Sequence, residues 1–347
     1  MKHRLFLIIA TAACLGGITA CSQDNDTVVP DGDLKAAISF NVNIGQTPDP
    51  QVSMRGASTN ADATGGYTFK GDELMAISVI GVANSSRSTS VAEVKNYRVA
   101  AGNGGSTAGS AKALTYTGAA TGAFQWLSQS EQIKIKAWSF GTTTSPGTTV
   151  PTTFSIETTQ TGDYVKELLY SPEASESYTS SAINIPLYHQ LARVVVNVTN
   201  TESDKYQDDG FSISSVVIGS TTNKIPTSAT FAEPASGNYG SWSSQGTDGT
   251  VTAKAETTVS GNKATYSAVV IPYDGTAVGN TDYYQSTHEF VKITTSRGIY
   301  IYKLASNLNI EPGKQYTFNI TNLNEIKLNV TVTAWDTSES ARSLTLE

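Results

Sequence analysis

Apolar and polar residues alternate in several short segments of this chain. The clearest is 37–44, where Ile38, Phe40, Val42 and Ile44 fall on one face and polar side chains separate them. A period of two is typical of a strand with one buried face. We therefore predict a first strand at 37–44. The further strands predicted in the first half are 74–82, 94–99, 131–140 and 164–170.

The same pattern continues more strongly after a change of composition near residues 172–181. No long stretch has helical periodicity, while Val, Ile, Thr and Tyr favour strands and Gly, Asn and Ser favour turns. Short strands with turn residues about every ten positions are typical of a β-sandwich. We predict an all-β protein with sandwiches at 36–180 and 182–347. The later strands are predicted at 183–187, 191–198, 211–218, 264–271, 288–295, 299–304, 314–321 and 326–335.

The last of these strands alternates in the same way as the first. Leu328, Val330, Val332 and Ala334 share one face. Taken by itself, the pattern indicates that 326–335 completes its own sandwich.

The first residues have the layout of a secretory signal. A basic start with Lys2 and Arg4 precedes a short apolar run and then small residues up to Cys21. The run is too short to cross a bilayer. The ending Ile18-Thr19-Ala20-Cys21 resembles a bacterial lipobox, which implies a signal peptide at 1–20 and a lipid on Cys21. Ordinary cleavage that leaves Cys21 unmodified is the alternative, and in either case 21–35 is interpreted as a polar tether.

Composition narrows the classes of function. The 347 residues include 2 cysteines, and Cys14 would leave with the signal peptide, so no disulfide is expected. The balance is 23 basic against 30 acidic residues. Loss of Lys2 and Arg4 lowers the basic count to 21, a balance of −9 for the mature chain. No basic patch recurs, which argues against nucleic acid as a partner.

Motifs for catalysis or metal binding are not evident. His3, His189 and His288 lack the spacing of a zinc site. Asp204, Asp208 and Asp209 could hold calcium, but a solvated hairpin tip fits their spacing better. The chain has no Gly-x-Ser-x-Gly elbow, P-loop or dinucleotide fingerprint. We therefore expect no enzymatic activity, no cofactor and no metal; Asp72, Glu73 and Asp163 are interpreted as turn formers.

Aromatic residues leave a second interpretation open. Tyr239, Trp242, Tyr283 and Tyr284 lie in loop-like segments and could present flat faces to sugars. The main alternative to a structural role is therefore a monomeric surface lipoprotein that binds glycans. Scattered tyrosines are equally common in β-sandwiches.

Two stretches resemble the fimbrillin family. Residues 184–198, with Leu191-Ala192-Arg193 between two strands, are similar to the opening of that family's second domain. Residues 310–320, with Glu311-Pro312-Gly313, followed by 330–335 are similar to its closing signature. The resemblance implies two transthyretin-like sandwiches in a subunit of a type V pilus at the surface of Bacteroides-type bacteria.

The resemblance also implies a route of assembly. The lipidated precursor reaches the outer membrane, where a trypsin-like protease cuts after an arginine behind the first strand. Loss of the strand with Ile38, Phe40, Val42 and Ile44 opens a groove. The C-terminal strand of another pilin subunit then fills it, with Leu328, Val330, Val332 and Ala334 as the candidate donor face here. The fibre would support adhesion to a host or bacterial surface.

Arg55 is the arginine whose place in the chain matches this cut. It lies in the polar segment 45–66 with Gly56 after it, and exposed loops of small residues are where proteases cut. The removable segment would then run to residue 55. Arg87 is a competing loop arginine, but a cut there would also remove the strand at 74–82. An ordinary loop arginine at 55 is the alternative, and the position of the subunit in the fibre stays open.

Overall fold

The structure is a computed structural model of the chain. It describes residues 35–44, 69, 71–82, 85–100, 111–162, 165–199, 212–243, 245–260, 263–321, 323, 328–334 and 342–344. Within these ranges the regular structure is β-sheet with one short 3-10 turn, Ala120–Gly122. None of the described segments forms a helix that is long and apolar enough to cross a membrane. The prediction of an all-β protein is confirmed.

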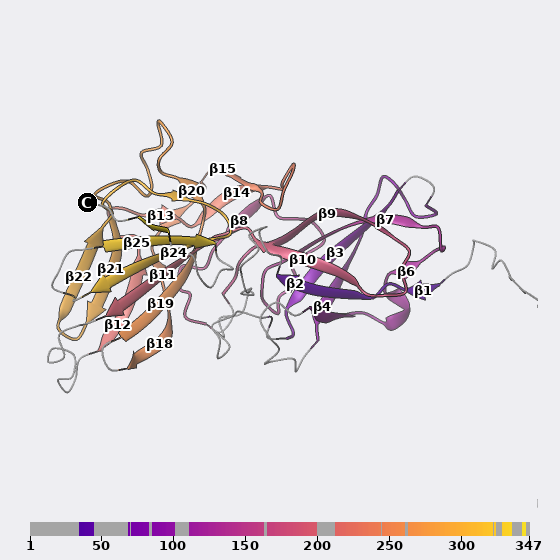
Figure 1. Cartoon of the computed structure of the whole chain (residues 1–347), viewed down its shortest axis with the longest axis horizontal. Coiled ribbons are helices and arrows are strands. Elements are labelled where there is room, and N and C mark those ends of the chain that lie inside the picture. The colour runs from indigo at the N-terminus through magenta and orange to yellow at the C-terminus, as the bar shows by residue number, and fades with distance from the viewer. Residues whose placement is uncertain are drawn as a thin grey trace, which may run out of the picture.

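The N-terminal strands close into a barrel with the strand order β10-β2-β5-β4-β3-β7-β9 (Figure 1). Inward and outward positions alternate in β7, where Ile133, Ile135 and Ala137 are buried while Lys134 and Lys136 point outward, and in β2 and β10. Period-two burial of this kind places the apolar face of these strands in the barrel core. The strands are β10 (Ile183–His189), β2 (Phe40–Ile44), β5 (Lys112–Tyr116), β4 (Glu93–Val99), β3 (Leu74–Gly81), β7 (Gln132–Ser139) and β9 (Leu169–Ser177).

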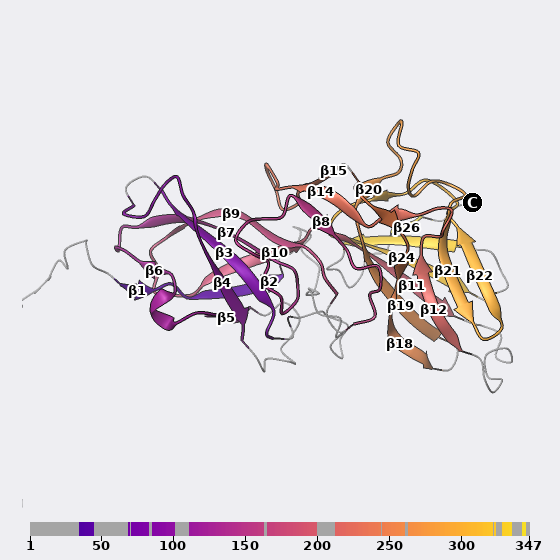
Figure 2. The same ribbon diagram turned by 180° about the vertical axis from the view of Figure 1, so that it is seen from behind.

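The C-terminal part is built from two larger sheets that enclose a second apolar core (Figure 2). The six-stranded sheet has the order β18-β19-β11-β24-β25-β26, and the four-stranded sheet has the order β17-β12-β21-β22. Their strands are β18 (Lys254–Ser260), β19 (Lys263–Val270), β11 (Ala192–Thr199), β24 (Lys314–Thr321), β25 (Leu328–Ala334), β26 (Arg342–Leu344), β17 (Val251–Thr252), β12 (Ile213–Ile218), β21 (Glu289–Thr295) and β22 (Gly298–Lys303).

The centre of the six-stranded sheet is the parallel pair β11 and β24. β11 is rich in valine, and Val194, Val196 and Val198 are buried against the second core. Across the pair, Val196 lies beside Phe318 and Val198 beside Ile320. β-Branched and aromatic side chains suit such a buried, pleated surface. The predicted strands 191–198 and 314–321 are both present.

Several short strands complete the described fold. β8 lies in sequence between barrel strands β7 and β9, but it pairs with β14, and Phe154 belongs to the second core. The chain therefore crosses from the barrel to the sandwich and returns before β9. The short strands are β1 (Ala36–Ala37), β6 (Gln125–Trp126), β8 (Thr153–Ser155), β13 (Ile225–Pro226), β14 (Ser228–Ala232), β15 (Ser241–Ser243), β16 (Asp248–Gly249), β20 (Tyr273–Asp274) and β23 (Asn309–Ile310).

Two boundaries differ from the sequence-based expectation. The range 182–347 begins with β10, but β10 pairs with β2 and β9, and Ile183, Ile185 and Leu187 pack in the barrel core. The chain leaves the barrel at Gln190 and Leu191, between β10 and β11. The expected strand at 164–170 is β9, which begins at Leu169 and runs on through the composition change to Ser177.

Candidate functional site

Strand β2 lies between β10 and β5 in the closed barrel. It pairs in parallel with β10 over the register Ile183↔Phe40 to Leu187↔Ile44. On its other side it pairs antiparallel with β5, through Asn41↔Ala113 and Val42↔Lys112. Because β2 lies between β5 and β10, its removal would open the barrel and expose a ladder edge on each neighbour.

The apolar face of this first strand is in the barrel core. Ile38, Phe40, Val42 and Ile44 are all buried, and Val42 has no exposed surface. The Phe40 ring meets Tyr97 edge to face at 5.3 Å, and it meets Phe124 at 6.2 Å. Such aromatic pairs add stabilisation to the burial of the rings themselves. The outward face is polar, and Asn41 Nδ2 donates to Asn184 Oδ1 at 3.2 Å.

The segment before β2 is held by a different part of the barrel. β1 forms a two-stranded sheet with β6, in which Ala36 pairs with Trp126 and Ala37 with Gln125. The Ile38 N–H then donates to the Phe124 carbonyl at 2.9 Å. Residues 36–38 therefore lie along segment 124–126, while 40–44 lies between β5 and β10. We call these surfaces together the strand groove.

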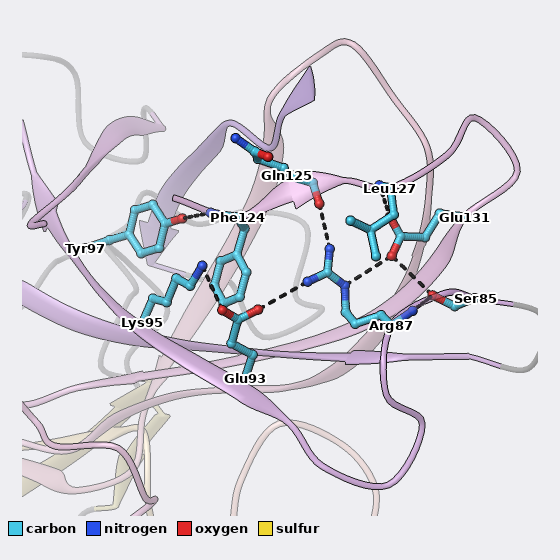
Figure 3. Close-up of polar contacts among 9 residues, drawn as sticks. All are labelled: Ser85, Arg87, Glu93, Lys95, Tyr97, Phe124, Gln125, Leu127 and Glu131. Atoms are coloured by element: carbon cyan, nitrogen blue, oxygen red, sulfur yellow. Dashed lines mark hydrogen bonds and ion pairs between the residues drawn. The ribbon is translucent and has the colours of Figure 1, made fainter. Parts of the chain in front are cut away.

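Three side chains hold the backbone of segment 124–127 (Figure 3). The Phe124 N–H donates to the Tyr97 hydroxyl at 3.1 Å, Arg87 Nη2 donates to the Gln125 carbonyl at 2.6 Å, and the Leu127 N–H donates to Glu131 Oε2 at 2.6 Å. Burial raises the pKa of Tyr97 to about 12, so this hydroxyl is neutral. Side chains here take the place of a longer sheet ladder.

Arg87 and Glu131 form the central ion pair of this network. Arg87 Nε lies 3.1 Å from Glu131 Oε1, and the Glu131 side chain is 1% exposed. Ser85 Oγ donates to the same oxygen at 3.2 Å. Arg87 also reaches Glu93 on the barrel wall at 3.3 Å. A buried charge is tolerated when it is paired and its lone pairs accept hydrogen bonds, as those of Glu131 do.

Glycine at position 81 allows this arrangement. The Gly81 N–H donates to the Ser88 carbonyl at 2.7 Å, and a Cβ on Gly81 would lie 2.5 Å from the Arg87 carbonyl oxygen. The loop after β3 can therefore fold back across the end of its own strand and direct Arg87 toward Glu131. As a result the Arg87 side chain is only 10% exposed.

The candidate donor strand lies in the sandwich. β25 pairs antiparallel with β24 from Ile320↔Leu328 to Lys314↔Ala334, and β26 pairs with β25. Val332 packs against the second core. β25 and β26 are the last two strands of their sheet, so they could leave without separating any other pair of strands in the order. The other expected sites, Cys21, Arg55 and Gly56, lie outside the described residues.

Three of the four aromatic residues considered for glycan binding pack in the sandwich, and Tyr239 packs edge to face against Tyr188 of β10, with the ring centroids 6.3 Å apart. Tyr284 is 1% exposed, and burial raises its pKa. The Trp242 ring lies 5.1 Å from Phe231, and its Nε1 donates to the Gln190 carbonyl at 2.7 Å. Tyr283 packs against the second core. Tyr239, Trp242 and Tyr283 are each only partly exposed.

Two of the titratable side chains noted in the sequence, His189 and Glu73, have structural partners. His189, the last residue of β10, is buried against Glu167, which lies just before β9. Glu73 is buried and accepts from the Gly71 N–H at 2.8 Å. Among the described residues no three His, Cys, Asp or Glu side chains gather as a metal site would require.

Comparison with known proteins gives the same fold. A family model described as fimbrillin-like matches residues 59–335. No curated protein matches the chain. The structure is similar to a candidate cell adhesion protein of Bacteroides uniformis, with 15% identity, a TM-score of 0.51 and coverage of 84% of this chain and 100% of that one. This likeness shows a shared fold.

Two further solved structures are similar at lower scores. One is a candidate cell adhesion protein of Bacteroides ovatus, with 14% identity, a TM-score of 0.49 and coverage of 88% and 99%. The other is the tip fimbrial protein Mfa3 of Porphyromonas gingivalis with a C-terminal truncation, with 10% identity, a TM-score of 0.42 and coverage of 86% and 100%.

Proposed function

Since the chain belongs to the fimbrillin-like family, we propose that it is a structural subunit of a cell-surface fimbrium that polymerises by strand exchange and supports adhesion. It is exported as a lipoprotein, anchored to the outer membrane through Cys21, cut after Arg55 by a trypsin-like protease, and joined to other pilin subunits. The observation that carries this proposal is the position of β2: it lies between β5 and β10 in the closed barrel and precedes every other barrel strand in the sequence, so one cut behind it releases it without any of the others.

Removing β2 would create the site for a partner strand. Unpaired strand edges accept another strand by backbone hydrogen bonding, and pockets for alternate side chains select its sequence. Loss of Phe40, Val42 and Ile44 would leave such pockets along the barrel core. Burying one aliphatic side chain is worth about 1.5–3 kcal/mol. Leu328, Val330, Val332 and Ala334 of a neighbouring subunit have the required alternation.

Arg87, the competing candidate for the cut, has a side chain that is only 10% exposed. A trypsin-like enzyme must take the arginine side chain into its specificity pocket. Arg87 is held by Glu131 and Gln125, and its loop is fixed to Gly81 by a backbone hydrogen bond to Ser88. This supports cleavage after Arg55, which follows β2 and would release the whole first strand.

Limited proteolysis of the precursor tests the proposal. With trypsin at low dose, we expect a new N-terminus at Gly56 and a ladder of oligomers that resists mild denaturant. Arg55→Gln should keep the chain monomeric, and a chain truncated before Lys327 should be cut normally but not assemble. A precursor that is cut after Arg55 and stays monomeric would contradict strand exchange, and an uncut Arg55 would contradict the processing site.

A further inference from the structure

Segment 124–127 depends on the first strand for its sheet pairing. β6 has only two residues, and β1 is its partner in the two-stranded sheet that the described residues form. The Phe124 carbonyl also accepts from Ile38. If the first strand leaves, all of these backbone contacts leave with it. A short segment that loses its ladder has little local structure to hold its shape.

The remaining anchors of this segment come from side chains that do not leave. Tyr97 lies on β4, Arg87 on the loop after β3, and Glu131 just before β7, so none belongs to the removable strand. They bind the Phe124 N–H, the Gln125 carbonyl and the Leu127 N–H, which are groups on three of four consecutive residues (Figure 3). Hydrogen bonds to charged groups are stronger than neutral ones.

The ring of Phe124 is fixed by the same network. It stacks on Tyr97 at 6.1 Å with an interplanar angle of 10°. Lys95 Nζ lies 4.5 Å from its centroid and is itself paired with Glu93 at 2.8 Å. The ring also contacts Phe40, but its contacts with Tyr97 and Lys95 involve no residue of the first strand. Phe124 therefore stays in position to meet an incoming side chain where Phe40 now packs.

We propose that Arg87 and Glu131, with Tyr97, form a clamp that keeps segment 124–127 ready to receive an incoming strand after the first strand is lost. Arg87 is a positioning residue in this role: it acts through the backbone of segment 124–127. The partner it prepares for is the apolar, alternating strand of another pilin subunit. This inference rests on the proposed function and adds to it a preformed end of the strand groove.

Because segment 124–127 is already ordered, the free-energy cost of binding an incoming strand is lower. A loose segment must be ordered at the moment of binding, and ordering a backbone opposes association. Side chains that fix the segment beforehand remove that cost. Loss of one charged hydrogen bond should therefore slow or weaken capture by about tenfold.

Two measurements on the full chain test the clamp, using Arg87→Met and the milder Tyr97→Phe. Arg98→Met is the matched control, because Arg98 forms a half-exposed ion pair with Asp72 in the same barrel. In hydrogen–deuterium exchange of the intact chain, we expect about tenfold faster exchange at 36–38 and 124–127 in Tyr97→Phe, with the amides of β3 and β7 exchanging as in the parent. Arg87→Met also breaks the buried pair with Glu131, so it should speed exchange at these segments by at least as much and lower the protection of β3 and β7 as well. Arg98→Met should match the parent throughout.

The second measurement follows capture of a strand. Each chain is cut with trypsin at low dose, and binding of a fluorescent peptide with residues 36–44 is measured. We expect about tenfold weaker or slower binding with Arg87→Met, a smaller loss with Tyr97→Phe, and no change with Arg98→Met. If Arg87→Met does not fold, Tyr97→Phe decides, because it removes one hydroxyl and keeps the ring.

The outcomes distinguish failure of the clamp from failure of strand exchange. Parent-like exchange at 124–127, or parent-like peptide binding, in both clamp variants overturns the clamp while leaving strand exchange intact. A parent chain that neither assembles nor binds the peptide after cutting refutes the proposed function itself, and the role of the clamp in capture with it.

Discussion

Glu131 illustrates how one buried acid can organise a loop that is distant in sequence. It accepts from Arg87 Nε, from Ser85 Oγ and from the Leu127 N–H. A carboxylate taken out of water is stable only with such partners. Gly81 contributes by leaving room for the returning loop. The same contacts that hold segment 124–127 also keep Arg87 away from a protease.

We expect Glu131→Ala to lower the free energy of unfolding by about 3–5 kcal/mol, because it breaks the buried ion pair and leaves the guanidinium of Arg87 with only the half-exposed Glu93 as a charged partner. Trypsin should then cut after Arg87, which the parent should resist. Urea denaturation and mass spectrometry of the fragments would check both. The control is Glu173→Ala, which breaks the half-exposed pair with Lys134 and should cost about 0–1 kcal/mol. A Glu131→Ala variant that is as stable as the parent and equally resistant to trypsin at Arg87 would contradict the importance of the Arg87–Glu131 ion pair.

The sequence revealed the apolar face of the first strand but not the side chains that hold segment 124–127. Ile38, Phe40, Val42 and Ile44 could be assigned to one face because a strand has a fixed period of two. Tyr97, Phe124 and Glu131 carry no such local pattern. Arg87 is 38 residues from Gln125 and 44 from Glu131, so only the folded barrel brings these groups together.

Strand β2 is an element whose importance should depend on the state of the chain. In the precursor it fills the barrel core and joins β5 to β10. After the proposed cut it would be absent. Substitutions in β2 and in the rest of the core should therefore behave differently in the two states.

Phe40→Ala should lower the free energy of unfolding of the precursor by about 3–5 kcal/mol, because it leaves a large cavity beside Tyr97 and Phe124. Assembled fibres made from the same variant should dissociate in denaturant as parent fibres do. Ile299→Ala is the control: Ile299 is 58% exposed, and the change should stay within about 0.5 kcal/mol. Fibres weakened by Phe40→Ala would show that β2 remains in place.

Strand β9 shows why some elements could not be predicted. Residues 173–177 of β9 are largely polar and exposed, and Pro172 lies where the pairing with β7 shifts register. Proline is tolerated at such bulges, but in a sequence it predicts the end of a strand. β11 and β24, by contrast, were predicted nearly to the residue because burial requires their run of β-branched and aromatic side chains.

Buried tyrosines should make the free energy of unfolding depend on pH in the alkaline range. Burial is the main cause of the raised pKa values of Tyr97, Tyr170, Tyr284 and Tyr316, and that of Tyr97 reaches about 12 against an unfolded value of 10.0. The folded chain therefore keeps protons that the unfolded chain releases. This contribution is fully present below about pH 10 and is lost as the pH rises through the folded values.

The free energy of unfolding should accordingly fall between about pH 10 and pH 12. Urea denaturation at several pH values, followed by circular dichroism, would measure the slope. Tyr97→Phe removes one of the titrating groups and should make the slope shallower. A free energy of unfolding that is flat across this range would contradict the assignment.

The crossing of β8 ties the barrel to the sandwich. Phe154, Ile156, Val165 and Leu168 lie in sequence between barrel strands, yet they belong to the second core. The barrel wall also reaches the sandwich directly, since Tyr170 donates to Glu233 at 2.6 Å and Lys136 pairs with the same carboxylate at 2.7 Å. The barrel sequence therefore includes apolar surface that only the sandwich covers.

A fragment of residues 35–190 should not behave as an independent domain. Its exposed apolar side chains should bind a hydrophobic dye, and its melting temperature should lie below that of the full chain, which should unfold in one calorimetric transition. The full chain is the reference in both assays. A fragment that melts at the temperature of the full chain and binds no dye would contradict this coupling.

The detour of β8 also has a consequence in time. A chain made from its amino end completes every barrel strand by His189, but the cover for Phe154 arrives only with Ala229, some forty residues later. During that interval all barrel strands have been synthesised, but the apolar side chains of the segment around β8 are still uncovered. A chaperone that binds the nascent chain would therefore act on this segment until the second half has been synthesised.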